Sequence, residues 1–328
     1  MHRVAICGCG AMSAEWIGHI KKRKDCHIVA LVDVNQPSAA QRKEQYNLTA
    51  ALYTDLKTAI AKERVNLVID ITPPAFHEKT VTTALKSGCH VFGEKPMSDT
   101  LRAAERMVAC ADATGQEYFV MQNRRYVPGL VALRDLVASD TLGNLGQLSA
   151  DFYLCPHFGG FRDEMASPLI ADMAIHTFDA ARFVLNRQVK SVYAQEFNPS
   201  WSWYKGNASA ICIFEMSDGT IFDYRGSWCT PGMLTSWESS WRASCSKGSA
   251  LWDGGRKLVY QLEDGEMQKA TLPKLQKQGH GGCIAELFDA LNNGKRPQTD
   301  CRDNVWSITM VYKAIESAKT GKKIIFDI

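Results

Sequence analysis

A lysine that follows a short apolar run near residue 90 is the first candidate for chemistry. Residues 89–92 are entered through Gly88, a pattern typical of a buried strand after a helix-ending glycine. The sequence Gly-Glu-Lys-Pro follows directly at residues 93–96. Ligands of open parallel sheets lie beyond the carboxyl ends of the strands, so Lys95 is expected to point toward a bound ligand. The ordinary alternative for Glu-Lys-Pro is a solvated turn.

The second candidate is an acid and a histidine four residues apart within residues 170–179. On a helix Asp172 and His176 share a face, and Asp179 falls on nearly the same face. Histidine can take and return a proton near pH 7, and an acid one turn away can orient it or bind a substrate hydroxyl. Such a pair is commonly a solvated surface pair, but the apolar flanks here argue against that. No metal site is expected, because a third nearby ligand is missing.

A glycine turn near the start of the chain indicates a dinucleotide site. The apolar residues 4–7 lead into Gly8-Cys9-Gly10, and residues 14–24 can form a helix. Gly8 permits a tight turn, Gly10 lets the backbone approach a pyrophosphate, and free N–H groups at the helix start can hold phosphates. Ser13 stands where a third glycine is usual, and it is small enough for close packing. A plain turn is the alternative.

The second strand predicts which nicotinamide cofactor binds. Residues 27–33 are apolar and end in Asp33, about 20 residues beyond the glycine turn. A carboxylate at that spacing accepts both ribose hydroxyls of the adenosine half and repels a 2′-phosphate. Val34 and Asn35 follow, so no arginine is at hand for that phosphate. NAD is therefore predicted in preference to NADP, with helix capping as the alternative role of Asp33.

Strand and helix patterns alternate up to about residue 122. Residues 65–71 are nearly all β-branched or aliphatic, as a doubly covered parallel strand should be, and the prolines after Thr72 start the next helix. Thr72 would border the cofactor, and His77 is expected to be structural or to lie at the cofactor edge rather than to be a catalyst. Five or six strands alternating with helices predict an α/β fold with a Rossmann, doubly wound parallel sheet.

The alternation of strand and helix patterns ends after Pro128. One helix is followed by strand-like runs with turn signals between them, which predicts a second α/β domain with a large, mostly antiparallel open sheet. The predicted strands are residues 146–154, 191–197, 209–216, 220–228 and 237–245. This region is rich in tryptophan, and an oligomer interface is favoured for most of these side chains over sugar stacking or core. The predicted domains are residues 1–122 and 123–328, with the option that the last helix or strand packs back on the first domain.

Composition narrows the class of protein. The 328 residues carry a formal net charge of +3 without a basic run, so neither nucleic acid nor a membrane surface is an expected partner. No export signal is recognised, and no apolar run reaches the ~18 residues that span a bilayer. Eleven scattered cysteines without a Cys-x-x-Cys pair favour reduced thiols in the cytoplasm over disulfides or zinc.

The ordered set of motifs GCGAMS, Asp33, ITPPAFH, GEKP, QNRRY and DMAIHTFD resembles the Gfo/Idh/MocA family, the group of glucose–fructose oxidoreductase and inositol dehydrogenase. The resemblance covers essentially the whole chain, including the closing NNGKRPQTD and SAKTGKKI segments. It implies a Rossmann domain and a second domain whose large open sheet commonly mediates homodimers or homotetramers. It also implies that Lys95, Asp172 and His176 line the substrate pocket, and that the Lys95–Pro96 bond is often cis. The family usually has glycine where Ala174 stands.

The resemblance implies a mechanism of hydride transfer between NAD and a secondary alcohol of a sugar, sugar acid or cyclitol. His176 takes the hydroxyl proton, Lys95 holds the developing oxyanion, and Asp172 fixes a neighbouring hydroxyl and orients His176. Candidates for substrate contacts, or else for plain salt bridges, are Arg124, Arg125 and Arg162. Residues expected at the cofactor are Gly8, Gly10, Ala11, Met12, Asp33, Thr72, Pro73, His77, Glu94, Lys95 and Asn123.

Two other functions fit the same motifs. One is a glycoside-cleaving enzyme that oxidises, eliminates and reduces again with a retained NAD. The other is a non-catalytic, NAD-sensing regulator. The presence of Lys95, Asp172 and His176 favours an enzyme, since a sensor needs the glycine turn but not an acid–base pair. The sequence leaves open the sugar, the direction of reaction and the size of the oligomer.

Overall fold

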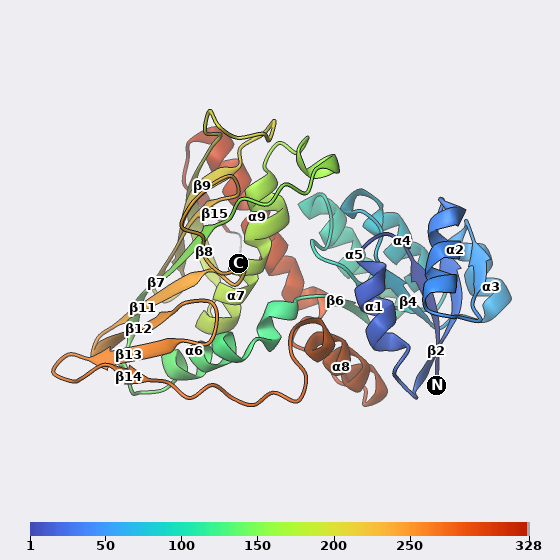
Figure 1. Ribbon diagram of the computed structural model, residues 1–328, viewed down its shortest axis with the longest axis horizontal. Helices are drawn as coiled ribbons and strands as arrows, with labels where there is room; N and C mark the ends of the chain where they lie inside the picture. The colour runs from blue at the N-terminus through green and yellow to red at the C-terminus, as the bar shows by residue number, and fades with distance from the viewer. Residues whose placement is uncertain (327–328) are drawn as a thin grey trace. The chain divides into compact units, whose positions relative to one another are not determined.

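A computed structural model describes residues 1–326 of the chain (Figure 1). Contacts within the chain divide it into two compact units. The first unit contains Met1–Asn123 and His280–Ile308, and the second contains Arg124–Gly279 and the residues from Thr309 onward. Most of helix α8 (Gly279–Asn292) therefore belongs to the first unit, whereas strand β15 (Ile324–Ile325) pairs with β8 (Val189–Phe197) in the second.

The first unit is built on a six-stranded parallel sheet of order β3-β2-β1-β4-β5-β6. Its strands are β1 (His2–Cys7), β2 (Cys26–Val32), β3 (Ala51–Tyr53), β4 (Leu67–Asp70), β5 (His90–Gly93) and β6 (Tyr118–Val120). Its helices include α1 (Ser13–Ile20), α2 (Gln36–Gln45), α3 (Leu56–Glu63), α4 (Pro74–Lys86) and α5 (Leu101–Thr114). The strand order reverses between β1 and β4, and such a switch point is where open α/β sheets bind ligands. The predicted doubly wound sheet is confirmed.

Local signals in the sequence explain where these helices begin and end. Asp55 accepts a hydrogen bond from the Thr58 amide at the start of α3, and Thr100 accepts one from the Ala103 amide at the start of α5. Helix α5 ends at Gly115, whose φ of +67° is the left-handed conformation that favours glycine. Pro74 occupies the first position of α4, where its missing N–H costs nothing.

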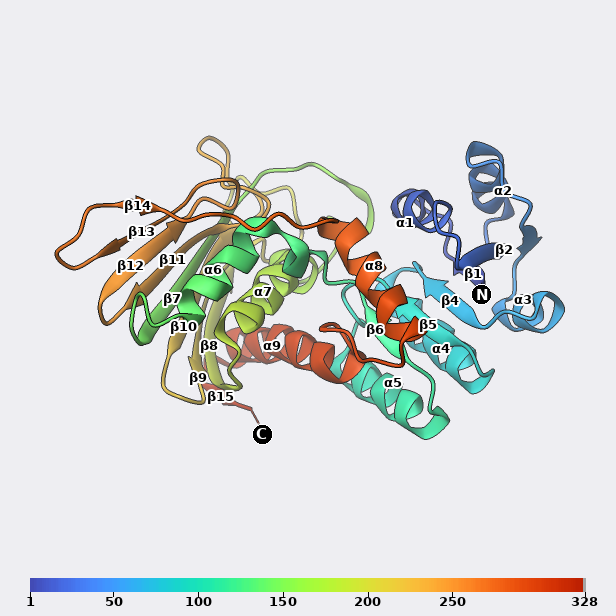
Figure 2. The ribbon, with the colours of Figure 1, turned by 90° about the horizontal axis from the view of Figure 1, so that it is seen from below.

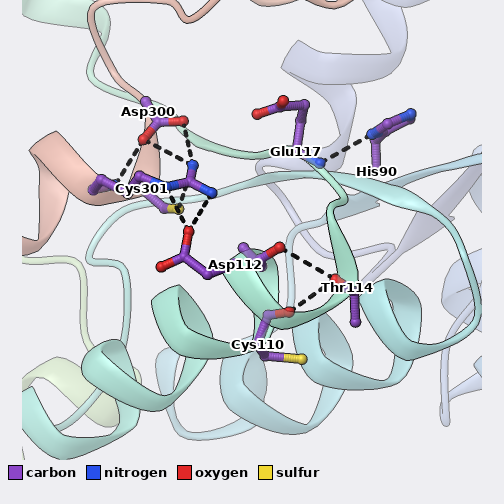
Figure 3. Close-up of polar contacts among 9 residues, drawn as sticks. His90, Cys110, Asp112, Thr114, Glu117, Asp300 and Cys301 are labelled. Atoms are coloured by element: carbon purple, nitrogen blue, oxygen red, sulfur yellow. Dashed lines mark hydrogen bonds and ion pairs between the residues drawn. The ribbon is translucent and has the colours of Figure 1, made fainter.

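The segment before helix α9 (Cys301–Thr320) is tied to the edge of this sheet (Figure 3). Asp300 forms an antiparallel bridge with Phe119, and the Val120 amide donates to the Thr299 carbonyl. Arg302 bridges two carboxylates, with its Nε 2.7 Å from Asp112 Oδ1 on α5 and its Nη1 3.0 Å from Asp300 Oδ2. These contacts fix the start of α9 in the first unit and cover the unpaired edge of β6.

The second unit is built on a nine-stranded sheet of order β14-β13-β12-β11-β7-β10-β9-β8-β15. Its remaining strands are β7 (Leu145–Tyr153), β9 (Ser209–Met216), β10 (Ile221–Ser227), β11 (Ser240–Cys245), β12 (Gly248–Trp252), β13 (Leu258–Leu262) and β14 (Gln268–Lys269). Strands β10 and β7 run parallel, and the other neighbouring pairs are antiparallel. The predicted mostly antiparallel sheet is confirmed.

Helices α6 (Pro128–Ala138) and α7 (Ile175–Leu185) lie on one face of this sheet (Figure 2). The buried side chains of the strands point to that face, for example Phe214 and Phe222, whose rings lie 5.6 Å apart. Phe178 of α7 packs edge-on against Phe214 at 4.9 Å. The helices therefore cover one face, and alternate residues of the strands remain on the other.

The prediction of an interface role for most tryptophans is wrong for three of them. Trp228, Trp241 and Trp252 are at most 1% exposed within the single chain, so they belong to its core. Trp228 stacks on Tyr204, Trp241 stacks on Phe222, and Trp252 lies against Gly129 of α6, contacts between distant parts of the chain that no periodicity in the sequence reveals. Trp201 and Trp237 keep 64% and 44% of their surface exposed.

Among the described residues, no helix is both long and apolar enough to cross a membrane. The eleven cysteines are all free thiols. Residues 1–326 contain no group of three or more histidine, cysteine or acidic side chains arranged to hold a metal ion.

Candidate active site

The glycine turn joins β1 to α1 at the switch point of the first sheet. Gly8 has a φ of +92°, and a Cβ there would lie 2.6 Å from the Ile71 carbonyl carbon, so no larger residue fits. A Cβ at Gly10 would meet nothing within 4 Å. Gly8 therefore packs against the backbone that follows β4, whereas the space beside Gly10 is empty. A pyrophosphate bound to such a turn needs access to the backbone at the position of Gly10.

Ser13 and Arg42 complete this turn in place of a third glycine. Ser13 is fully buried, and its hydroxyl donates to the Gly10 carbonyl oxygen at 2.6 Å. Arg42 of α2 donates from Nε to Ser13 Oγ at 2.9 Å and from Nη2 to the same Gly10 carbonyl at 2.9 Å. A charged donor on a carbonyl oxygen makes a strong hydrogen bond, so Arg42 stiffens the turn. The residue lies too far along the chain from the glycines for their spacing to indicate it.

Asp33 follows β2 and faces the glycine turn. Its Oδ2 accepts from the Cys9 amide at 2.7 Å, and its Oδ1 accepts from the Asn35 amide at 2.8 Å. These two bonds fix the carboxylate at the rim of the turn while leaving lone pairs on both oxygens. The group can therefore accept hydroxyl donors from a ribose. Ala11 and Met12, which follow the glycines, are both exposed there.

The turn after β4 contains a buried acid that the sequence analysis did not single out. Asp70 is fully buried, and its Oδ1 accepts from the amide and the hydroxyl of Thr72 at 3.1 and 2.6 Å. Burial raises the pKa of the Asp70 carboxyl, and the neighbouring His77 opposes that rise. Thr72 is thereby held at the carboxyl end of the central strand, with exposed Pro73 next to it.

His77 links this turn to the one that carries Lys95. Its Nε2 lies 2.6 Å from the Thr72 carbonyl oxygen, and its Nδ1 lies 3.1 Å from the carbonyl oxygen of Pro96. A neutral ring has one N–H and donates to one side, whereas the protonated ring donates to both. The ring is 1% exposed. His77 therefore has a structural position, between two backbone turns.

Glu94 fixes the backbone of Lys95. The carboxylate is 7% exposed, and its Oε1 accepts from the indole Nε1 of Trp16 at 2.6 Å. Its Oε2 accepts from the Lys95 amide at 3.1 Å. The Lys95–Pro96 peptide bond is cis, which confirms that expectation. Trp16 belongs to α1, so its hydrogen bond joins that helix to Glu94, and a second hydrogen bond joins Glu94 to the backbone of half-buried Lys95.

Asp172 and His176 lie on a helix of the second unit, and both are buried, at 5% and 8% exposure. The helix begins as a π-helical turn at Leu169–Ala174 and continues as α7, rather than being α-helical throughout. A four-residue spacing keeps two side chains on one side in either geometry, so the sequence pattern does not distinguish them. Arg162 donates from Nε to Asp172 Oδ2 at 2.6 Å. Ala174 is fully buried between the two candidates.

Arg124 and Arg125 are buried in ion pairs of the second unit. Arg125 forms a bidentate pair with Asp179, at 2.8 Å from Nε and 2.7 Å from Nη2. Arg124 lies 3.0 Å from Glu238, and burial lowers the pKa of its guanidinium. Salt bridges are thus present for both arginines and for Arg162. Their contacts with a substrate stay a prediction, as does the contact of half-buried Asn123 with the cofactor.

Two segments of the chain match models of one protein family. Residues 2–122 match the family model described as "Oxidoreductase family, NAD-binding Rossmann fold". Residues 130–251 match the model of the GFO/IDH/MocA C-terminal domain. The chain belongs to the Gfo/Idh/MocA family of oxidoreductases. The expected enzyme class, a nicotinamide-dependent oxidoreductase, is confirmed by this membership.

Relatives of this Gfo/Idh/MocA protein include proteins with different named substrates. It is 22% identical to a 1,5-anhydro-D-fructose reductase of Ensifer adhaerens, and the match covers 98% of each chain. It is 30% identical to an inositol 2-dehydrogenase of Corynebacterium glutamicum, over 67% of this chain and 65% of the relative. An uncharacterized protein of Sinorhizobium fredii is 27% identical, over 90% and 87% of the two chains.

Solved structures share the whole Gfo/Idh/MocA fold. An oxidoreductase from Agrobacterium radiobacter, in complex with NAD+, L-tartaric acid and magnesium, superimposes with a TM-score of 0.90 at 21% identity, covering 99% of this chain and 98% of that one. An aldose-aldose oxidoreductase from Caulobacter crescentus, complexed with glycerol, gives a TM-score of 0.86 at 19% identity and covers 99% of both chains. At these identities the likeness establishes the fold.

Three residues that hold the candidate site of the first unit were not predicted from the sequence: Trp16, Arg42 and Asp70. Trp16 and Arg42 have partners far away in sequence, 78 residues for Trp16 with Glu94 and 32 for Arg42 with Gly10, whereas Asp70 binds Thr72 two residues on and is distinguished by its full burial. The available signal was weak. A tryptophan and an arginine on helix faces beside the glycine turn, and an acid at the end of an apolar strand, are common in folded proteins.

Proposed function

We propose that this protein is an NAD-dependent dehydrogenase or reductase that transfers a hydride between the cofactor and a secondary alcohol or ketone of a sugar, sugar acid or cyclitol. The observation that carries the proposal is the combination of a completed phosphate turn with a buried acid–histidine pair on the substrate domain. A regulator that only sensed NAD would not need to keep Asp172 and His176 out of water. The relatives named for inositol and anhydrofructose supply the substrate class.

The residues of the first unit fit NAD. Gly10 leaves room for a pyrophosphate, and Asp33 offers carboxylate oxygens to the two ribose hydroxyls. The same negative charge disfavours a 2′-phosphate. An arginine does lie at the glycine turn, Arg42 of α2, contrary to the expectation from residues 34 and 35. Its Nε, Nη1 and Nη2 donate to Ser13, Gln45 and Gly10. We therefore infer a preference for NAD over NADP. When bound, the nicotinamide supplies the acceptor of the hydride.

The chain's own residues move the proton and stabilise charge. In the oxidative direction His176 accepts the proton of the substrate hydroxyl, and the Lys95 ammonium stabilises the negative charge that develops on the oxygen. Asp172 binds a neighbouring hydroxyl and orients His176, with Arg162 holding its Oδ2. Glu94 keeps the Lys95 backbone in position. In the reverse direction His176 returns the proton to the carbonyl oxygen of the substrate, and Lys95 stabilises the same developing charge.

The proposal is tested by following the absorbance of reduced nicotinamide while the protein meets inositols, aldoses and sugar acids with NAD or NADP. Lys95→Ala and His176→Ala should each lower kcat by about 10²–10⁴-fold on the best substrate. Lys57→Ala and His27→Ala are matched controls, because both side chains are exposed in the first unit away from the glycine turn. Unchanged turnover in Lys95→Ala or His176→Ala would overturn the assigned roles.

We also propose that subunits associate through the open face of the nine-stranded sheet, as a homodimer or homotetramer. Exposed apolar side chains collect on that face of β8 and β9, where Tyr193 stands opposite Ile213 and Ile211 stands beside them. These three side chains are 45–47% exposed in the single chain. A sheet face with neighbouring apolar side chains is stabilised when it is covered.

A further inference from the structure

Two loops of the second unit expose aromatic rings beside the helix that carries Asp172 and His176. Residues 154–168 contain Phe158 and Phe161, and residues 228–239 contain Trp237. These three side chains, named here the aromatic platform, are 56%, 54% and 44% exposed. Single exposed aromatic residues are ordinary on protein surfaces, whereas several neighbouring ones are typical of interaction and ligand-binding surfaces.

The platform rests on buried rings. Phe158 lies 6.1 Å from Trp237 and 6.1 Å from Trp228, measured between ring centroids. Trp228 is fully buried and stacks on Tyr204 at 5.7 Å, while Trp237 also meets Phe152 at 6.4 Å. Phe158 and Trp237 therefore rest on buried rings, so ligand binding would cost little ordering of these two side chains.

Arg162 connects the platform to the candidate acid. Its guanidinium carbon lies 4.7 Å from the centre of the Phe161 ring and 5.6 Å from that of Phe158. The same side chain donates to Asp172 Oδ2 at 2.6 Å. A single side chain, Arg162, therefore contacts both phenylalanine rings and Asp172. The ion pair with Asp172 offsets the charge of Arg162, so the platform favours an apolar group over a phosphate.

The second loop is anchored next to the candidate base. Ser239 has a φ of +68°, unusual for a residue other than glycine, and its hydroxyl lies 3.1 Å from Thr177 Oγ1. The preceding Glu238 pairs with buried Arg124 at 3.0 Å. Thr177 directly follows His176 in the helix. Trp237 is therefore held by its neighbours at a set position relative to the acid–histidine helix.

We propose that the aromatic platform is a stacking subsite for an apolar or aromatic group joined to the sugar, so that the preferred substrates are glycosides rather than free monosaccharides or cyclitols. This inference rests on the proposed function and specifies its substrate class. The sugar ring with the reacting hydroxyl lies at Asp172 and His176, and its aglycone covers Phe158, Phe161 and Trp237. An apolar or aromatic aglycone would stabilise the complex by burying the three side chains and by stacking on their rings. A free inositol has no such group and would leave the platform exposed to water.

The test compares methyl and phenyl β-glycosides of glucose, galactose and mannose, which differ only in the aglycone. With the NAD-loaded protein, the phenyl glycoside should give a kcat/KM about tenfold higher than its methyl counterpart. Trp237→Ala and Phe161→Ala should bring that ratio close to one while the methyl glycoside is still turned over, which shows that both variants fold. Met267→Ala is the matched control, because Met267 is 64% exposed in the turn between β13 and β14. Its ratio should equal that of the wild type.

A second measurement separates this inference from the proposed function. Saturation-transfer NMR on the wild type and on Trp237→Ala reports binding of phenyl glucoside without requiring turnover. Binding that depends on Trp237, without oxidation of any panel member, would support the subsite and overturn the proposed reaction. Turnover with equal use of methyl and phenyl glycosides, or of free sugars alone, would overturn the subsite and leave the reaction intact. Dissociation of an oligomer by Trp237→Ala would assign the platform to a subunit contact and overturn the subsite.

Discussion

Glu94 is a buried acid whose two oxygens are engaged by different parts of the first unit. Trp16 donates to Oε1 and the Lys95 amide donates to Oε2. A buried carboxylate oxygen that loses its donor costs about 1–3 kcal/mol. Loss of the Trp16 N–H would therefore destabilise the folded protein by more than the net value of one ordinary hydrogen bond. The backbone of Lys95 is therefore linked, through Glu94, to a tryptophan on another element.

Replacing Trp16 with phenylalanine tests this dependence. Trp16→Phe keeps the ring but removes the N–H, and we expect unfolding free energy to fall by about 1–3 kcal/mol and kcat to fall several-fold. Chemical denaturation and the nicotinamide assay measure the two effects. Trp252→Phe is the control, because Trp252 is also buried and its Nε1 donates to the Gly255 carbonyl at 3.0 Å. Equal losses of kcat in the two variants would show that Glu94 does not position Lys95 through Trp16.

The glycine turn shows how two residues of one type serve different purposes within an element. Gly8 is required by its positive φ and by the approach of β4, whereas Gly10 faces open space. Gly8→Ala should therefore lower the unfolding free energy by about 2–4 kcal/mol. Gly10→Ala should leave the Tm within a few degrees of the wild type and weaken NAD binding about tenfold or more, measured by calorimetry. Normal NAD affinity in Gly10→Ala would place the pyrophosphate elsewhere.

Glu196 of β8 connects a strand to the start of the helix that carries Asp172. The Ser167 hydroxyl donates to its Oε2 at 3.0 Å, and Oε1 has no partner among the described residues. Burial raises the pKa of Glu196 to about 7, and the Ser167 hydroxyl and Lys319 oppose that rise. Between about pH 4.5 and 7 the unfolded chain releases this proton while the folded chain keeps it. The contribution of Glu196 to stability therefore falls as pH rises through that window.

Glu196→Gln should remove this pH dependence. The free energy of unfolding of the variant minus that of the wild type should be about 1–3 kcal/mol larger at pH 8 than at pH 5. Urea denaturation at both pH values measures the difference. The matched control is Glu215→Gln, since the paired lysines 190 and 323 lower the pKa of Glu215 to about 2 and it stays ionised across the window. A wild-type-like pH dependence in Glu196→Gln would show that another group is responsible.

For the molecule as a whole, the open face of the large sheet governs association. We expect Ile213→Glu to dissociate the oligomer, because it places a charge among apolar side chains that a partner would cover. Light scattering coupled to size-exclusion chromatography gives the mass of each species. Met267→Glu introduces the same charge just before β14, at the other end of the sheet from β8 and β9, and should keep the wild-type mass. A wild-type protein that is monomeric at micromolar concentration would contradict the proposed association.

The sequence by itself determined the strand–turn–helix at Gly8 and Gly10, the alternation that makes a doubly wound sheet, and the change to hairpins after Pro128. These follow from local rules of periodicity, glycine conformation and proline placement, which act between neighbouring residues. The helix with Asp172 and His176 was predicted as well, although its π-helical first turn was not.

Tertiary structure alone decided which polar groups are paired. Arg42 reaches Gly10 across 32 residues, and Trp16 reaches Glu94 across 78. It also decided that Trp228 is core and that Trp237 is exposed, although both lie in the same apolar neighbourhood of the sequence. Burial and hydrogen-bond partners depend on elements that are distant in the chain, and one sequence records the residues but not the distances between them.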